Sequence, residues 1–114
     1  MDVEFLLEAV DELVELETDK FYVNDRNLER KVSYTIKLLT GNYKKPTHLI
    51  MNNKTFAELA KSNKVTSSEQ RYSSKGMVGT YDGVFVFVRK ELRDNDVLVA
   101  IKENEFQTAV LAKV

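Results

Sequence analysis

The sequence of 114 residues has no cysteine and only one histidine, His48. The lack of cysteine excludes disulfides, thiolate metal sites and cysteine nucleophiles, and it fits a reducing compartment. A zinc site needs three or four converging ligands, so one histidine without cysteine predicts no zinc site. A lone histidine in a probable strand is more often a packed or edge residue than a ligand, and we expect that role for His48.

Long apolar runs are missing as well. None approaches the ~20 residues that span a bilayer, and the N-terminus is acidic, which is not the pattern of a secretory signal. Apolar residues make up 43% of the chain, enough for the core of one domain. The sequence therefore predicts a single domain over residues 1–114 in a soluble intracellular protein, with no membrane as a partner.

Recognisable reaction centres are also missing. A serine nucleophile needs a base and an oxyanion donor. The candidate serines instead share one polar stretch that is typical of turns: Ser62, Ser67, Ser68, Ser73 and Ser74. The adjacent acids Asp11 and Glu12 belong to a polar helix face, where nothing predicts a buried carboxyl group. We predict no catalytic, cofactor-binding or metal-binding residue, no cofactor, and a protein that is not an enzyme.

Glycine is scarce, and three of the four glycines lie close together: Gly76, Gly79 and Gly83. A dinucleotide-binding loop has to follow a strand and open a helix. Here a strand-like run follows the glycines, and no Gly-Lys-Ser/Thr ending occurs. The spacing therefore favours turns and close backbone approach in a sheet. The pair Asp82-Gly83 predicts a type I′ hairpin turn.

Charge is distributed unevenly, although the net charge is only −1. The first 19 residues hold eight acids and no base: Asp2, Glu4, Glu8, Asp11, Glu12, Glu15, Glu17 and Asp19. The remaining chain holds ten acids and all 17 bases, a balance of +7. One interpretation is a solvated helix face. The other is a helix that docks on a basic surface, its own or a neighbour's. The bases are scattered, so nucleic-acid binding is the weaker hypothesis.

Apolar residues at helical spacing predict an amphipathic helix over residues 3–17, within the acidic segment 1–19. Its apolar stripe consists of Phe5, Leu6, Ala9, Val10, Leu13 and Val14. A second helix is predicted over residues 26–40. We expect Asn24 or Asp25 as its N-cap and Gly41-Asn42 as a left-handed stop.

Runs of β-branched and aromatic residues predict a small sheet. Its strands are expected at Phe21–Val23, Thr47–Met51, Val84–Val88, Val97–Ile101 and Phe106–Val114. A short third helix is expected through Lys61, with Asn52 or Asn53 as its N-cap. Residues 62–75 are polar and predict an exposed loop. The expected fold class is α+β, with two or three helices packed on a small, mostly antiparallel sheet.

Four features follow one another in residues 26–114. The predicted helix 26–40 leads into Pro46-Thr47-His48-Leu49-Ile50-Met51-Asn52, and the short helix 54–61 comes directly afterwards. A glycine-spaced hairpin, Gly76-x-x-Gly79-x-x-x-Gly83-Val84-x-Val86, then precedes the closing strands. In this order the features resemble the tailed-phage major capsid protein family, with the Hong Kong 97-type capsid fold shared with encapsulins. The chain is similar to a short or truncated member.

The resemblance implies a (pro)phage head protein that packs with copies of itself into capsomers and closes a shell around DNA. It implies the core of a capsid peripheral or axial domain, other phage head proteins as further partners, and only indirect contact with packaged DNA. It also implies a location in the virion or the bacterial host cytoplasm. The polar loop 62–75 would lie near a capsomer centre or a subunit edge. Acidic residues 2–19 would face basic residues of a neighbour, such as Arg26, Arg30, Lys31 and Lys37.

Two other hypotheses stay open. One is a small non-enzymatic α+β module that binds or regulates a protein partner through the acidic helix or loop 62–75. The other is an enzyme without a recognisable motif, which a cleft-bound His48 with converging carboxylates would favour.

Overall fold

A computed structural model of the chain describes residues 3–16, 21–24, 27–67, 76–103 and 107–113. These residues form three helices: α1 (Val3–Leu16), α2 (Leu28–Asn42) and α3 (Asn53–Leu59). They also form seven strands: β1 (Phe21–Asn24), β2 (His48–Met51), β3 (Val65–Ser67), β4 (Met77–Tyr81), β5 (Val84–Val88), β6 (Val97–Lys102) and β7 (Gln107–Lys113). None of the described helices is long and apolar enough to cross a membrane.

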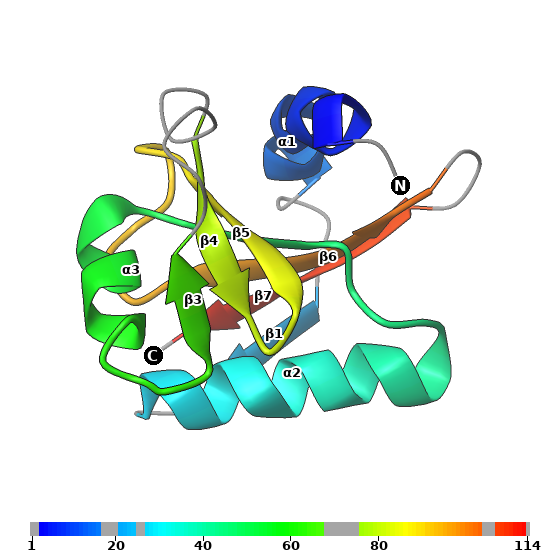
Figure 1. Cartoon of the computed structure of the whole chain (residues 1–114). Coiled ribbons are helices and arrows are strands. Elements are labelled where there is room, and N and C mark those ends of the chain that lie inside the picture. Colours follow the sequence, from blue (N-terminus) through cyan, green and yellow to red (C-terminus); the bar gives the residue numbers. More distant parts are fainter. Residues whose placement is uncertain (1–2, 17–20, 25–26, 68–75, 104–106, 114) are drawn as a thin grey trace.

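The seven described strands form one sheet in the order β1-β7-β6-β2-β5-β4-β3. Four of the six strand pairs are antiparallel, while β1–β7 and β2–β5 are parallel. Helix α1 lies on one side of the sheet and α2 on the other (Figure 1). The predicted α+β class, with two or three helices packed on a mostly antiparallel sheet, is confirmed.

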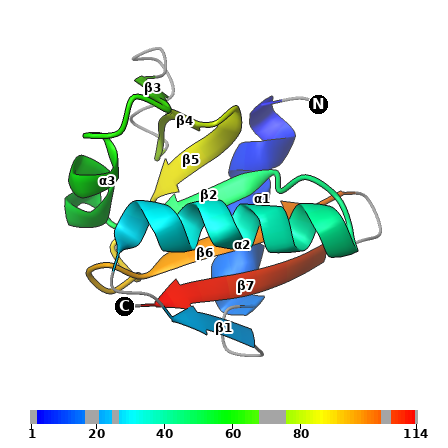
Figure 2. The same cartoon turned by 90° about the horizontal axis from the view of Figure 1, so that it is seen from below.

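The interior strand β6, next to the central strand β2, contributes side chains to both layers of the molecule. Successive side chains of a strand point to opposite faces. Val99 and Ile101 join the core cluster beneath α2, whereas Leu98 and Ala100 join the cluster beneath α1. Figure 2 shows α2 lying over β6 and running roughly along the strands of its face. Every residue of β6 up to Ile101 is buried, because both faces of this strand are covered.

Helix α1 forms because its apolar residues recur on one side of the helix. Leu6, Ala9, Val10 and Leu13 are buried against the sheet, as the predicted stripe requires. The predicted helix over residues 3–17 is confirmed up to residue 16, and residue 17 lies outside the described residues.

The predicted ends of the second helix were wrong by two residues. Its N-cap is Asn27, whose side-chain oxygen accepts a hydrogen bond from the backbone N–H of Arg30 at 2.8 Å. Its last turn runs through Gly41 and ends at Asn42, and neither residue has the positive φ of a left-handed stop. The backbone N–H of the C-cap residue Tyr43 instead donates to the Leu39 carbonyl oxygen at 2.8 Å, which pairs one of the last four carbonyls of the helix.

The central strand β2 continues directly into α3. Asn52 is the N-cap, since its side-chain oxygen accepts from the backbone N–H of Thr55 at 2.8 Å. This confirms one of the two predicted caps. The helix ends at Leu59, two residues before the predicted end at Lys61.

Part of the predicted polar loop 62–75 is a strand. Residues 65–67 form β3 and pair with β4 at the sheet edge, while residues 68–75 lie outside the described residues. A Cβ atom at Gly79 would lie 2.4 Å from the backbone oxygen of Thr66, so only glycine permits this pairing. Asp82 and Gly83 both have positive φ, 49° and 80°, as the predicted hairpin turn requires. The glycines thus provide close approach and turns.

Candidate interaction surfaces

His48 lies in β2 with its side chain fully buried. Its ring stacks on Phe87, with 4.9 Å between the ring centroids. Its Nε2 lies 2.9 Å from the backbone oxygen of Leu6 in α1, and its Nδ1 lies 2.6 Å from Thr47 Oγ1. Because a carbonyl only accepts, Nε2 carries the proton and donates to Leu6, and Nδ1 accepts from the Thr47 hydroxyl. The expected role as a packed residue is confirmed.

The electrostatics of His48 fit a structural link between α1 and the sheet. Burial lowers the pKa of His48 to about 4, and its hydrogen bond to the Leu6 carbonyl opposes part of this shift. The ring is therefore neutral at pH 7. Within the described part of the chain, no three His, Cys, Asp or Glu side chains come together in a way that could hold a metal ion.

The outer face of α1 carries the exposed acids Glu8, Asp11 and Glu12, which we call the α1 acidic face. Asp11 forms an ion pair with Arg89, and a Glu12 carboxylate oxygen lies 3.2 Å from Lys102 Nζ. The side chains of Asp11 and Glu12 nevertheless remain 74% and 62% exposed. The α1 acidic face is therefore largely solvated, as one interpretation predicted, while two of its acids also pair with bases of the same chain.

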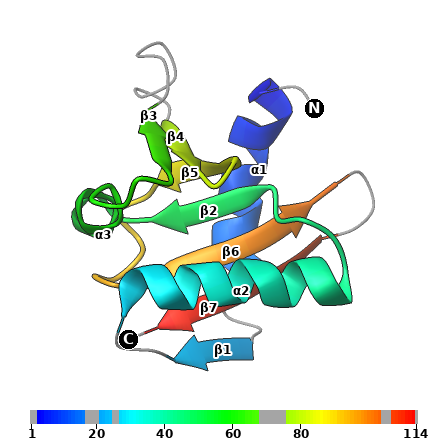
Figure 3. The ribbon, with the colours of Figure 1, turned by 60° about the horizontal axis from the view of Figure 1, so that its bottom comes forward.

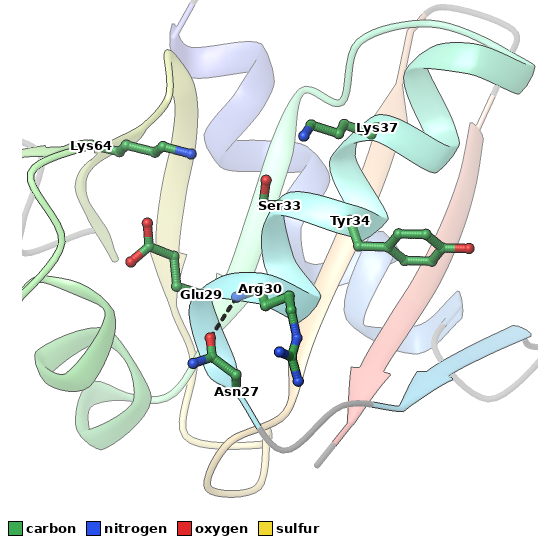
Figure 4. A pocket seen from close by; sticks show the side chains of 7 residues that line it. All are labelled: Asn27, Glu29, Arg30, Ser33, Tyr34, Lys37 and Lys64. Carbon is green, nitrogen blue, oxygen red and sulfur yellow. Dashed lines mark hydrogen bonds between the residues drawn. The ribbon is translucent and has the colours of Figure 1, made fainter.

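A groove of about 450 Å³ lies between α2 and the segment before β3 (Figure 4). We call it the α2 groove, and its lining consists of Asn27, Glu29, Arg30, Ser33, Tyr34, Lys37 and Lys64. Arg30, Tyr34 and Lys37 are exposed and follow the i, i+4, i+7 spacing of one helix face. Tyr34 is 56% exposed, a large aromatic surface for a residue outside the core.

The α2 groove combines three bases with one acid. Lys37 extends from α2 and Lys64 from the segment before β3, with the Glu29 carboxylate between these two walls (Figure 4). The hydroxyl of Ser62 donates to Glu29 Oε1 at 3.0 Å. Lys64 Nζ also lies 5.8 Å from the centroid of the Tyr81 ring, a cation–π distance. The groove therefore offers several bases around one acid, while the Tyr34 ring points to the side of α2 away from Lys64 (Figure 4).

Tyr81 is buried in β4, and its hydroxyl has no hydrogen-bond partner among the described residues. Burial, together with the nearby carboxylates of Glu29 and Asp82, raises the pKa of Tyr81 to about 12. The phenol therefore stays protonated at neutral pH. Its ring forms part of the core beneath α2.

The four bases proposed to face a neighbour lie in different environments. Arg30 and Lys37 line the exposed α2 groove. Lys31 is fully buried, and its ammonium group donates to the backbone oxygen of Asn95. Its expected contact with a neighbour is therefore wrong, because the side chain turns into the protein. Arg26 lies outside the described residues.

Sequence reasoning missed Tyr34 and Lys64 as surface residues of interest. The spacing of Arg30, Tyr34 and Lys37 on the polar side of the predicted helix could have indicated the first. Nothing in the sequence places Lys64 beside that helix. Among the candidate serines, Ser62 makes the turn hydrogen bonds that were predicted, since its hydroxyl also accepts from the Lys64 N–H. Ser67 lies in β3, and the other candidate serines lie outside the described residues.

Comparisons of the chain with models of protein families, with curated proteins and with solved structures found no match. The functional interpretation therefore follows from the chain's own residues. The features of the molecule on which it depends are the buried strand β2, the α1 acidic face and the α2 groove.

Proposed function

We propose that this chain is a structural self-assembly protein of the tailed-phage major capsid type, which packs with copies of itself into a shell around DNA. The observation that carries the proposal is the place of the family-like segments in the sheet. The strand from Pro46–Asn52, β2, lies between β5 of the glycine-spaced hairpin and β6, the first closing strand. Segments that resemble the family in their order along the chain thus form one continuous core.

The environment of His48 supports a role without catalysis. Both ring nitrogens have partners inside the protein, and the ring stacks on Phe87. A general acid or base has to reach a substrate proton, whereas the imidazole of His48 is fully buried between the sheet and α1. The histidine within the family-like motif therefore contributes to the fold.

The layered architecture supports association with copies of the same chain. Assembly into rings uses heterologous interfaces, in which two different surfaces of one subunit meet on its neighbours. The α1 acidic face and the α2 groove are two such surfaces, and the sheet lies between their helices (Figure 3). They differ in charge and in shape.

Electron microscopy and light scattering of the purified chain test this function. The chain is concentrated stepwise and its mass is measured by size-exclusion chromatography with light scattering. The proposal predicts rings or closed shells whose mass is a multiple of the 13.1 kDa chain. A monomer at every concentration up to the solubility limit contradicts it.

A second candidate function is a small module that binds a protein partner. The observation that favours it is the exposed Tyr34 beside Arg30 and Lys37, since tyrosine and arginine are enriched at protein interfaces. In this hypothesis the chain stays monomeric and its α2 groove holds an acidic segment of another protein. The mass measurement above separates the two functions.

A further inference from the structure

The two outer layers of the molecule carry opposite charge. The α1 acidic face presents three exposed acids on one side of the sheet. The α2 groove presents three bases on the other side. The sheet separates the two helices (Figures 1 and 3), so the acids of one copy do not meet the groove of the same copy. A second copy can bring the two surfaces together.

We propose that the α2 groove of one copy receives the α1 acidic face of a second copy, so that the chain associates head to tail. This inference rests on the proposed self-assembly function and identifies the contact that drives it. Charge complementarity selects the occupant, because opposite potentials across an interface steer the encounter and fix its register.

The spacing of side chains on the two helices fits this contact. Glu8 and Glu12 lie one helical turn apart on α1, and Arg30, Tyr34 and Lys37 lie on successive turns of α2. Arginine binds a carboxylate through two parallel hydrogen bonds. Tyr34 supplies an apolar ring with a polar tip, which suits the centre of an otherwise polar contact.

The intramolecular ion pairs of α1 are compatible with a second contact. Asp11 and Glu12 bind Arg89 and Lys102 and still expose most of their side-chain surface. An ionised carboxylate has about four acceptor positions, so one base does not saturate it. The apolar row of α1 packs it against the sheet, and the ion pairs with Arg89 and Lys102 leave acceptor positions of the carboxylates open outward.

A protein surface fits the α2 groove better than a nucleic acid does. Glu29 lines the groove and would repel a continuous phosphate backbone, whereas separate carboxylates on a helix can avoid it. The chain as a whole has a net charge of −1, so its overall field does not attract a polyanion.

The geometry also determines what kind of assembly results. Because the two surfaces differ and lie on opposite sides of the sheet, two copies cannot make both contacts with each other, so the contact is heterologous and leaves one free surface at each end of an open oligomer. Such a contact closes into a ring if the rotation between copies permits, and otherwise extends into a filament. A symmetric dimer with two identical surfaces in contact is excluded by this arrangement.

Charge reversal on each surface separately tests the contact by sedimentation velocity of the full chain. One variant carries Arg30→Glu and Lys37→Glu, and the other carries Glu8→Lys and Glu12→Gln. Glutamine at the last position avoids a like charge beside Lys102. The association constant of each variant alone should fall at least about tenfold, since the substitutions replace an attraction with a repulsion. An equimolar mixture should associate again, because each variant keeps one intact surface.

A matched control and a folding check accompany this test. Lys54→Glu reverses an exposed charge on α3, outside both surfaces, and should leave association unchanged. Circular dichroism verifies that every variant is folded. Raising the salt concentration from about 0.05 M to about 0.5 M should weaken wild-type association, since the Debye length becomes shorter.

The outcomes separate this contact from the assembly function itself. A wild-type chain that never associates overturns the assembly function and the contact with it. A wild-type chain that associates while both variants associate equally well overturns the contact alone. If a labelled single-stranded oligonucleotide binds the wild type, fails to bind the Arg30→Glu/Lys37→Glu variant and does not compete with association, the groove belongs to nucleic acid and the contact is wrong.

Discussion

The two helices that cover the sheet are attached to it in different ways. Helix α2 buries an apolar row that includes Leu39, together with the whole side chain of Lys31, whose ammonium group donates to a backbone oxygen. Helix α1 buries a comparable apolar row that includes Leu13. Its polar attachments, however, come from a titratable ring, His48, and from ion pairs at the surface.

This difference distinguishes a layer that responds to solution conditions from one that does not. Acid adds a proton to Nδ1 of His48, which places a charge on a buried ring and removes the acceptor for the Thr47 hydroxyl, so this attachment beneath α1 is sensitive to acid. The ion pairs of Asp11 and Glu12 are exposed, so salt screens them. The layer that carries the acidic face is therefore the one that acid and salt should loosen, whereas burial holds the α2 layer.

The largest expected effect comes from truncating the apolar row of each helix. Leu13→Ala and Leu39→Ala should each lower the free energy of unfolding by about 2–5 kcal/mol, because both side chains are buried and leave a cavity. Urea unfolding, followed by circular dichroism and by tyrosine fluorescence, measures the free energy of unfolding of each variant. One sheet backs both layers, so each variant should unfold in a single transition. Separate transitions for Leu13→Ala alone would mean that α1 is an independent unit.

The next effect is a loss of stability in acid through His48. Its pKa is lowered from 6.5 to about 4 in the folded chain, so the unfolded chain binds the proton first as the pH falls. The contribution of the neutral His48 ring to the free energy of unfolding is complete above pH 6.5. It is lost as the pH falls to 4, which lowers the free energy of unfolding by about 3 kcal/mol. The matched variant His48→Gln cannot titrate there. Plotted against pH, the stability of the wild type should fall more steeply than that of the variant, and parallel curves would contradict this role.

Smaller effects are expected at the two helix caps. Asn27→Ala removes one capping hydrogen bond of α2 and should cost about 1 kcal/mol. Asn52→Ala should cost about 2 kcal/mol, because the Asn52 amide also donates to Leu92 and to Asp94. Its hydrogen bond is the main reason why the pKa of Asp94 is lowered, so this pKa should rise in the variant, as measured by NMR titration. Equal losses of unfolding free energy in the two variants would contradict a contribution from the hydrogen bonds of Asn52 to Leu92 and Asp94.

The smallest effect is expected for the ion pairs of α1. Asp11→Asn and Glu12→Gln should each cost between zero and about 1 kcal/mol, since both acids are exposed. High salt should abolish even this difference in thermal melting experiments. A larger cost that persists in high salt would show that these pairs, and not the apolar row, hold α1 in place.

The features that the sequence predicted well depend on local patterns. The apolar stripe of α1, the Asn52 cap and the Asp82-Gly83 turn each follow from a few neighbouring residues and their backbone preferences. The buried role of His48 followed from its place in an apolar strand. These elements need little information from distant parts of the chain.

The features that the sequence did not predict depend on distant partners. Lys31 is buried because an oxygen of Asn95, far along the chain, meets its ammonium group, and no local pattern indicates this. The strand β3 is short and polar, and it exists because β4 offers it a neighbour at the sheet edge. The α2 groove likewise combines a helix with Lys64 from another segment.

A crosslinking experiment tests the proposed head-to-tail assembly most directly. Because the chain has no cysteine, Glu8→Cys and Lys37→Cys can be introduced in separate chains and the two proteins mixed under mild oxidation. Head-to-tail contact should give a disulfide-linked dimer that joins position 8 of one copy to position 37 of the other, identified by mass spectrometry. A mixture in which this crosslink is absent, or no more abundant than 8–8 and 37–37 crosslinks, would contradict the assembly proposed here.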